Sequence, residues 1–224
     1  MWVRNIGQEL HILRPILNAY RRISANAYEH NFHSALLAAI KPGDNVWDVG
    51  ANVGFYTELF ANVVGSEGKI IAFEPSPKAF GILRSLAAKR NNILLQNVAL
   101  SDTDGLVDFF VNNQELSTTD GLMPASDEAE TIKVSVKRAD TFIQLASPSI
   151  IKIDVEGFEL EVLNGMRQTL CLANLRAVFI EVHFLALRKK GTPGAPITIA
   201  KILRDNGFRI SWTDPSHIFA SRNS

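Results

Sequence analysis

The sequence predicts an α/β protein whose mostly parallel β-sheet carries helices on both faces. Short apolar runs alternate with amphipathic stretches along most of the 224 residues, which is the pattern of repeated strand–helix–strand units. A glycine-rich turn joins the first apolar run to the amphipathic stretch that follows it. Acidic residues stand at the ends of later runs, and in open parallel sheets those strand ends share the edge where ligands bind.

The elements follow from periodicity and from breaker residues. Residues 1–40 have helical spacing, with a break at Pro15 and a second helix over residues 25–40, and we expect them to form an N-terminal helical extension of a domain that spans residues 41–224. Strands are predicted at residues 45–49, 69–73, 93–97, 150–154 and 176–182. Helices are predicted at residues 54–64, 77–90, 158–173 and 195–206.

Two regions depart from this alternation. Residues 107–111 and 131–136 have the two-residue period of antiparallel strands, and the polar segment between them reads as a long loop and candidate lid. Residues 208–212 and 217–220 predict a C-terminal antiparallel hairpin around Asp214 and Pro215.

Composition excludes several classes of protein. Basic and acidic residues both number 23, so the formal net charge is zero and no nucleic-acid surface is expected. The single cysteine, Cys171, lies in an apolar stretch and is predicted to be a small core residue, which favours a reducing, cytoplasmic location. A membrane location is disfavoured, because no apolar run is long enough to span a bilayer and the N-terminus lacks a signal-peptide pattern.

The turn after the first strand carries an acid among its glycines. Asp48 precedes Gly50, and Gly54 closes the turn, but Asn52 stands where a dinucleotide-binding turn needs its second glycine. A carboxylate here would repel a diphosphate, whereas it suits a ligand that carries positive charge. S-adenosylmethionine, with its ammonium and sulfonium groups, meets that requirement.

A second acid ends the next strand. Glu74 follows the run from Lys69 to Phe73 and precedes Pro75, which stops the strand. In a strand–helix–strand unit, an acid at this place can accept both ribose hydroxyls of an adenosine. The alternative is a local role in the turn before the next helix, and the glycine turn upstream favours the ribose interpretation.

The last two parallel strands end in a group of titratable residues. Alternation directs Lys152, Asp154 and Glu156 to one side, and it directs Glu181 and His183 to one side of the following strand. His183 is a candidate general base, although a structural histidine is an equal alternative. A divalent cation held by Asp154, Glu156, Glu181 and His183 is possible but not favoured, since no tight ligand spacing demands it.

Five motifs in this order make the chain resemble the FkbM-type methyltransferases, a branch of the class I S-adenosylmethionine-dependent enzymes. They are Val-Trp-Asp-Val-Gly-Ala-Asn-Val-Gly-Phe-Tyr, Phe-Glu-Pro-Ser-Pro, Asn-Val-Ala-Leu-Ser-Asp-Thr-Asp-Gly, Ile-Lys-Ile-Asp-Val-Glu-Gly-Phe-Glu and Ile-Glu-Val-His. The resemblance covers about residues 29 to 219 and implies a Rossmann-like sheet of seven strands, one of them antiparallel in the last hairpin. It implies methyl transfer, commonly to a hydroxyl of a sugar, polyketide or lipid-linked glycan.

The resemblance also assigns roles to residues. It places Asp48, Gly50, Asn52 and Gly54 around the methionine part of the cofactor and Glu74 on the ribose. The adenine would be flanked by the end of the third strand, with Asn97, Ala99, Leu100 and Asp102. Asp154 would lie near the methyl group, and Glu156, Glu181 and His183 would face the acceptor.

Two other functions remain open at this stage. A nicotinamide-dependent oxidoreductase uses a similar sheet, but Asp48 and the missing middle glycine oppose it. A non-catalytic protein could keep the fold and bind only the cofactor or a glycan. Residues 1–24 are expected to cover the carboxyl ends of the strands and to bind the acceptor, with an oligomer interface as the alternative.

Overall fold

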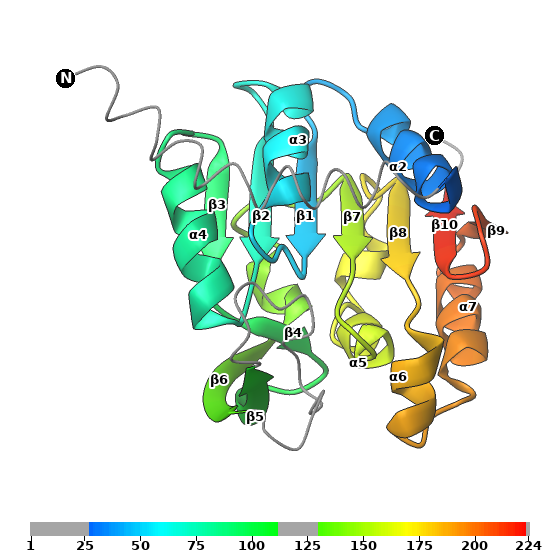
Figure 1. Cartoon of the computed structure of the whole chain (residues 1–224). Helices are drawn as coiled ribbons and strands as arrows, with labels where there is room; N and C mark the ends of the chain where they lie inside the picture. Colours follow the sequence, from blue (N-terminus) through cyan, green and yellow to red (C-terminus); the bar gives the residue numbers. More distant parts are fainter. Residues whose placement is uncertain (1–26, 112–129, 223–224) are drawn as a thin grey trace.

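The computed structural model describes residues 27–111 and 130–222, whose strands form two sheets. In spatial order, the strands of the large sheet are β3 (Ile93–Gln96), β2 (Lys69–Phe73), β1 (Asn45–Val49), β7 (Ile150–Ile153), β8 (Ala177–Glu181), β10 (His217–Ser221) and β9 (Arg209–Trp212) (Figure 1). The small sheet has the order β4 (Ala99–Ser101), β6 (Glu130–Arg138) and β5 (Gly105–Val111).

The large sheet confirms the predicted topology. Strands β3, β2, β1, β7 and β8 are parallel, and β10 is antiparallel to both of its neighbours. Because β1 lies between β2 and β7, the chain changes direction across the sheet at β1, and ligands of such sheets bind at that point. The carboxyl ends of the parallel strands lie at one edge of the sheet. Helix α6 (Phe184–Lys189) follows β8 and lies beyond this edge (Figure 1).

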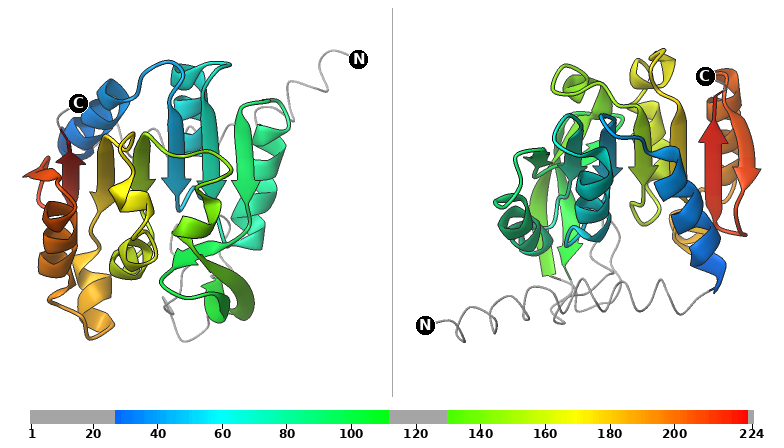
Figure 2. Two further views of the ribbon diagram at one scale, coloured as in Figure 1. Left: turned by 180° about the vertical axis from the view of Figure 1, so that it is seen from behind. Right: turned by 90° about the horizontal axis from the view of Figure 1, so that it is seen from above.

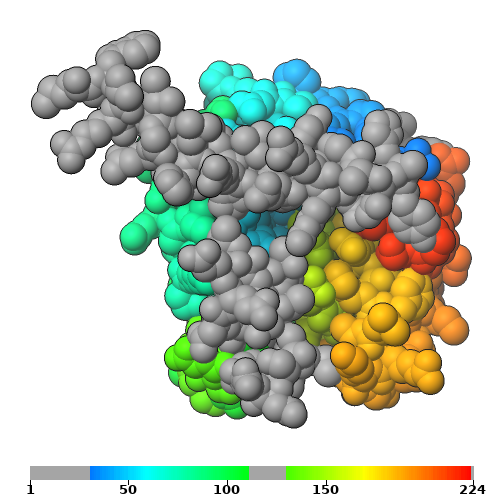
Figure 3. Space-filling model, in the orientation of Figure 1, coloured from blue at the N-terminus to red at the C-terminus, as the bar shows by residue number. Residues whose placement is uncertain are grey.

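Helices cover both faces of the large sheet. One face carries α2 (Ala27–Ala39), α3 (Phe55–Val64) and α4 (Pro77–Ala87), and the other carries α5 (Glu159–Asn164) and α7 (Ala195–Asp205) (Figure 2). The space-filling view places the green α4 region at one side of the molecule and the orange to red C-terminal region at the other, as the strand order requires (Figure 3).

Strand alternation divides the core into two layers. Val46 and Ile70 pack with α2 and α3, whereas Trp47 and Ile71 pack with α5 and α7, and all four side chains are buried. Helix α2 belongs to the same core, because Phe32, Leu36 and Ile40 join the first layer. Residues 1–24, the part of the predicted 1–40 extension that was expected to cover the strand ends, lie outside the described residues.

The small sheet lies beyond the carboxyl ends of β1 to β3 (Figure 1). Strands β5 and β6 pair antiparallel along their length, as the sequence predicted, and β4 pairs parallel with β6. Most of the predicted lid, residues 112–129, lies outside the described residues.

The helix predicted over residues 158–173 begins as expected, but its predicted length is wrong. Helix α5 ends at Asn164, and the chain turns before a short 3₁₀ helix at Thr169–Cys171. The break occurs where Gly165 packs against the Ser101 carbonyl oxygen, which would lie 1.9 Å from a Cβ atom. The Asp140 carboxylate then accepts the backbone N–H groups of Gln168 and Thr169, which holds the new direction.

Smaller corrections accompany this break. Strand β4, helix α6 and a 3₁₀ helix at Ala139–Phe142 were not predicted, since each is too short to show a period. Cys171 is exposed, so its assignment to the core is wrong, because the 3₁₀ helix turns its side chain outward. Within the described residues, no helix combines the length and apolarity needed to cross a bilayer.

The contact of Gly165 gives a test of the fold. Gly165→Ala forces the new methyl group onto the Ser101 carbonyl, and we expect it to lower the free energy of unfolding by about 2 kcal/mol or more. Gly81→Ala, in α4 with open space around its Cβ position, is the control and should raise stability by about 0.4–1 kcal/mol. Urea unfolding measures both. Equal stability of the Gly165 variant and the wild type would contradict the close packing of Gly165 against the Ser101 carbonyl.

Candidate active site

A cavity of about 210 Å³ opens at the carboxyl ends of β1, β2 and β7. The small sheet supplies its other wall, through β4 and through Phe109 of β5. Six of the residues predicted from sequence for the cofactor line this cavity: Gly50, Asn52, Glu74, Ala99, Leu100 and Asp154.

Four other predicted cofactor residues do not line it. Asp48 is fully buried beneath the turn, and Gly54 begins α3 against the side chain of Leu83. Asn97 donates its amide hydrogens to the carbonyl oxygens of Glu74 and Pro75, so it fixes the end of β2. Asp102 lies exposed after β4.

The turn after β1 requires its glycine. Gly50 has a φ of 77°, and a Cβ atom there would lie 1.8 Å from the carbonyl oxygen of Asp154. This close approach brings the ends of β1 and β7 together. Asn52 and Glu156 also have positive φ values, 50° and 53°, so both loops on the cavity wall contain a non-glycine residue in the left-handed region.

Glu74 directly follows β2, and both of its carboxylate oxygens accept hydrogen bonds. One accepts the backbone N–H of Asn52 and the other that of Ser76, each at 2.7 Å. Burial raises the pKa of Glu74 to about 7, although these two hydrogen bonds act in the opposite direction. Each oxygen keeps a further lone pair, so the group can accept hydroxyl donors from the cavity.

A buried lysine connects β1 to β7. The Lys152 ammonium lies 3.5 Å from Asp48 Oδ1 and 3.2 Å from Asp154 Oδ2, and it donates to the Gly50 carbonyl oxygen at 3.2 Å. Asp48 also accepts the Thr57 hydroxyl at 2.6 Å. Burial opposes the charge of Lys152, but the two carboxylates raise its pKa above the ordinary value. The positive charge beside Asp48 is therefore supplied by the protein itself.

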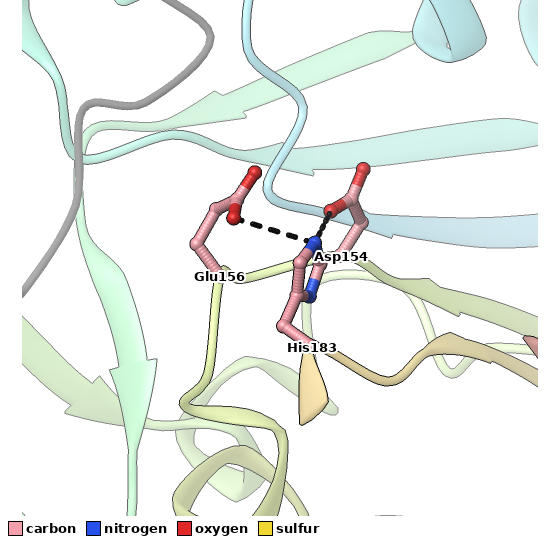
Figure 4. Close-up of side chains that lie close together, drawn as sticks. All are labelled: Asp154, Glu156 and His183. Carbon is pink, nitrogen blue, oxygen red and sulfur yellow. Dashed lines mark ion pairs between the residues drawn. The ribbon is translucent and has the colours of Figure 1, made fainter. Parts of the chain in front are cut away.

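The candidate catalytic residues lie close together around His183. Its Nδ1 is 2.7 Å from Glu159 Oε1, and its Nε2 is 3.4 Å from Glu156 Oε2 and 3.7 Å from both Asp154 Oδ1 and Glu181 Oε1. Figure 4 shows the side chains of Asp154 and Glu156 pointing toward the imidazole from the loop after β7. Four carboxylates thus surround one histidine.

This arrangement sets the charges of the group. Burial favours a neutral ring, but the hydrogen bond to Glu159 and the charges of Asp154, Glu156 and Glu181 raise the pKa of His183 to about 10. Burial also raises the pKa of Glu156 to about 7. Burial opposes the ionisation of Asp154 as well, yet Lys152 and His183 bring its pKa below the ordinary value. At neutral pH the imidazole is charged, and the proton-accepting atoms around it belong to carboxylates.

Ligand atoms of Asp154, Glu156 and His183 lie within 4.8 Å of one another, a spacing that one cation could bridge. The positive charges of His183 and Lys152 already stand among these carboxylates. The geometry therefore permits a cation without requiring one.

Several residues of the site were missed from the sequence. Phe109 and Phe158 line the cavity, Glu159 orients His183, and His217 lies 3.4 Å from Glu181 Oε2. The pairing of Lys152 with Asp48 was also missed, although β-sheet register places their Cα atoms opposite each other. Only Glu159 had a sequence signal, because it closes the run Asp-Val-Glu-Gly-Phe-Glu.

The seven-stranded sheet and its cavity define a Rossmann-like α/β fold of the methyltransferase type. Similar folds occur in the methyltransferase FkbM of Methylobacillus flagellatus (TM-score 0.55, 16% identity, 79% of this chain and 43% of that one). They also occur in precorrin-6y C5,15-methyltransferase of Geobacter metallireducens (TM-score 0.51, 14% identity, 85% of this chain and 87% of that one).

Residues 48–210 match the methyltransferase FkbM domain, and the chain belongs to that family. It is 30% identical to hexuronic acid methyltransferase AglP of Haloferax volcanii over 66% of this chain and 59% of that protein. It is also 30% identical to 31-O-demethyl-FK506 methyltransferase FkbM of Streptomyces tacrolimicus, over 76% of this chain and 75% of that protein. The chain thus spans less than two thirds of AglP.

The buried lysine gives the second prediction. Lys152→Met leaves Asp48 and Asp154 without their partner, and we expect the free energy of unfolding at neutral pH to fall by about 3–5 kcal/mol. Lys133→Met is the control, because its pair with Asp108 is exposed and should contribute less than about 1 kcal/mol. Chemical denaturation measures both. Similar losses in the two variants would show that Lys152 does not hold β1 and β7 together.

Proposed function

We propose that this chain catalyses methyl transfer from S-adenosylmethionine to a hydroxyl group of a sugar, a glycan or another small-molecule acceptor. One observation carries the proposal. In a chain of the FkbM family, Glu74 lines the same cavity as Asp154 and Glu156, two of the carboxylates around His183, at the point where the sheet changes direction.

The residues of the cavity fit the cofactor. Gly50 lines the cavity where its close approach to the Asp154 carbonyl brings the ends of β1 and β7 together, and Glu74 can accept two ribose hydroxyls. Phe109, Ala99 and Leu100 offer an apolar wall to the adenine. Asp48 acts on the methionine part through Lys152 and the Gly50 carbonyl. Asn97 holds the end of β2 behind Glu74, and Asp102 lies beyond the wall.

The protein groups would then position the acceptor and take its proton. When bound, S-adenosylmethionine supplies a methyl group already activated by the sulfonium. Asp154 stands between the cavity and His183, and Glu156 lines the cavity with its side chain 45% exposed. We propose that the group formed by His183, Asp154, Glu156 and Glu181 accepts the hydroxyl proton, since all three carboxylates lie within 3.7 Å of His183 Nε2.

The acceptor class follows from the relatives. AglP is named for a hexuronic acid, and NoeI of Sinorhizobium fredii, 26% identical over 70% of this chain and 71% of that protein, is named a 2-O-methyltransferase. A hydroxylated ring compound fits both names. Two other functions are outcomes of the tests: an oxidoreductase would bind NADH, and a binding protein would hold the cofactor without transferring its methyl group.

In the decisive experiment, the protein is incubated with S-adenosylmethionine that carries an isotopically labelled methyl group. The acceptors are hexuronic acids, neutral sugars and glycan extracts from cells that lack the protein. Mass spectrometry of the products should show label in an ether-linked methyl group. Cofactor binding without any labelled product would support the binding protein instead.

The third prediction concerns the cofactor. S-adenosylmethionine and its demethylated product should raise the unfolding temperature, whereas NADH should not. Because ribose hydroxyls donate to the ionised carboxylate, and the pKa of Glu74 is about 7, affinity for the cofactor should rise as the pH increases from 6 to 8. Glu74→Gln should weaken binding about tenfold or more and remove the pH dependence.

Glu67→Gln, at an exposed carboxylate, is the control for this prediction and should bind like the wild type. Calorimetric titration at several pH values measures all three proteins. Wild-type affinity in the Glu74 variant would remove that residue from the ribose site.

The fourth prediction concerns proton transfer. His183→Gln removes the centre of the carboxylate group, and we expect turnover with the identified acceptor to fall by about 10²–10⁴-fold while cofactor affinity stays close to wild type. Lys189→Gln, exposed on the neighbouring helix, should leave both values unchanged. Treatment with a chelator should also leave turnover unchanged. A loss that magnesium or manganese restores would instead assign a cation to this group.

A further inference from the structure

A second histidine lies behind the proposed catalytic group. His217 begins β10 directly opposite Glu181, the last residue of β8, and it is only 4% exposed. Its Nδ1 is 2.7 Å from Asp214 Oδ1, and the same carboxylate oxygen accepts the backbone N–H groups of Ser216 and His217. Asp214 therefore fixes one side of the imidazole to the turn between β9 and β10.

The other side of this imidazole faces the site. His217 Nε2 lies 3.4 Å from Glu181 Oε2, and the second oxygen of Glu181 lies 3.7 Å from His183 Nε2. Glu181 thus lies between two imidazoles, in a row of contacting side chains that runs in the order Asp214, His217, Glu181, His183, Glu159. The Glu181 side chain is 35% exposed, and of its two imidazole neighbours His217 is the nearer.

The plane of the His217 ring is fixed from a third direction. The ring of Phe32 lies 4.2 Å from it, centroid to centroid, at an angle of 39°. Phe32 is buried in α2 and also packs edge-on against Phe179 of β8. Helix α2 therefore reaches the acceptor half of the site through a single aromatic contact.

We propose that His217 is a positioning residue, which holds the Glu181 carboxylate against His183 while Asp214 and Phe32 fix its own ring. The role rests on the proposed function, because it concerns the group that would receive the acceptor proton. Its geometry is independent of the acceptor. The competing explanation is that His217 only joins the start of β10 to Asp214, in which case its Nε2 side carries no function.

Two substitutions separate these explanations. In His217→Asn the short amide can reach Asp214 but not Glu181, whereas in His217→Gln the longer amide can donate to Glu181 as Nε2 does. Both variants remove the ring from Phe32, so they are matched for that loss. The measured quantity is the titration midpoint of the His183 imidazole, followed by long-range proton–nitrogen NMR on the full chain without ligands. His183→Gln assigns the signal.

The expected result is a difference between the two variants. In His217→Asn the carboxylate of Glu181 moves away, and the midpoint of His183 should fall by about 1 pKa unit. In His217→Gln it should stay near the wild-type value. Glu181→Gln should lower the midpoint like His217→Asn, because it removes the same charge from Nε2.

Other results would overturn the proposal. Equal midpoints in the Asn and Gln variants, or a midpoint that ignores Glu181→Gln, would leave His217 with a structural role only. If His217→Asn fails to fold, judged by thermal unfolding, Asp214→Asn provides the second test, and an unchanged His183 midpoint there would also contradict the role. Since this measurement needs no acceptor, its failure is distinct from a failure to find methyl transfer.

Discussion

The active-site edge depends on one ammonium group. Lys152 joins the end of β1, through Asp48 and the Gly50 carbonyl, to the end of β7, through Asp154. A buried cation between two carboxylates is stable only if all three stay in register, because each would be strongly destabilising without its partner. The register of β1 with β7 therefore also determines where Asp154 stands in the cavity.

The two halves of the site differ in how they are built. The half that we propose for the cofactor rests on parallel strand ends and on backbone contacts, such as the two N–H groups that hold Glu74. The half that we propose for the acceptor is built from charges. Four carboxylates lie around His183, and a second histidine, His217, contacts one of them, Glu181. This division agrees with the chemistry that we propose, in which the cofactor must be held in position and the hydroxyl proton of the acceptor must be transferred.

Local sequence patterns predicted every described strand except β4, the glycine turn and most of the acids, because alternation and turn chemistry depend on neighbouring residues. Other features depend on distant partners and had no local signal. Gly165 follows α5 at a place where the Ser101 carbonyl, 64 residues earlier in the numbering, leaves no room for a side chain, and Lys152 meets Asp48 only through sheet register. His217 reaches the site because β10 runs antiparallel, which brings its first residue to the edge where β8 ends.

The reversed direction of β10 separates the turn before it from the parallel strands that end at the same edge. The parallel strands end at this edge, but β10 begins there, so the turn before β10 is linked to the site through the contacts of Asp214 with His217 and of His217 with Glu181. Together with the segment after β8, this turn can change in length and composition while β1, β2 and β7 remain untouched. On the proposed assignment of the site, a change of acceptor can therefore come from this turn without any change in the strands that would bind the cofactor.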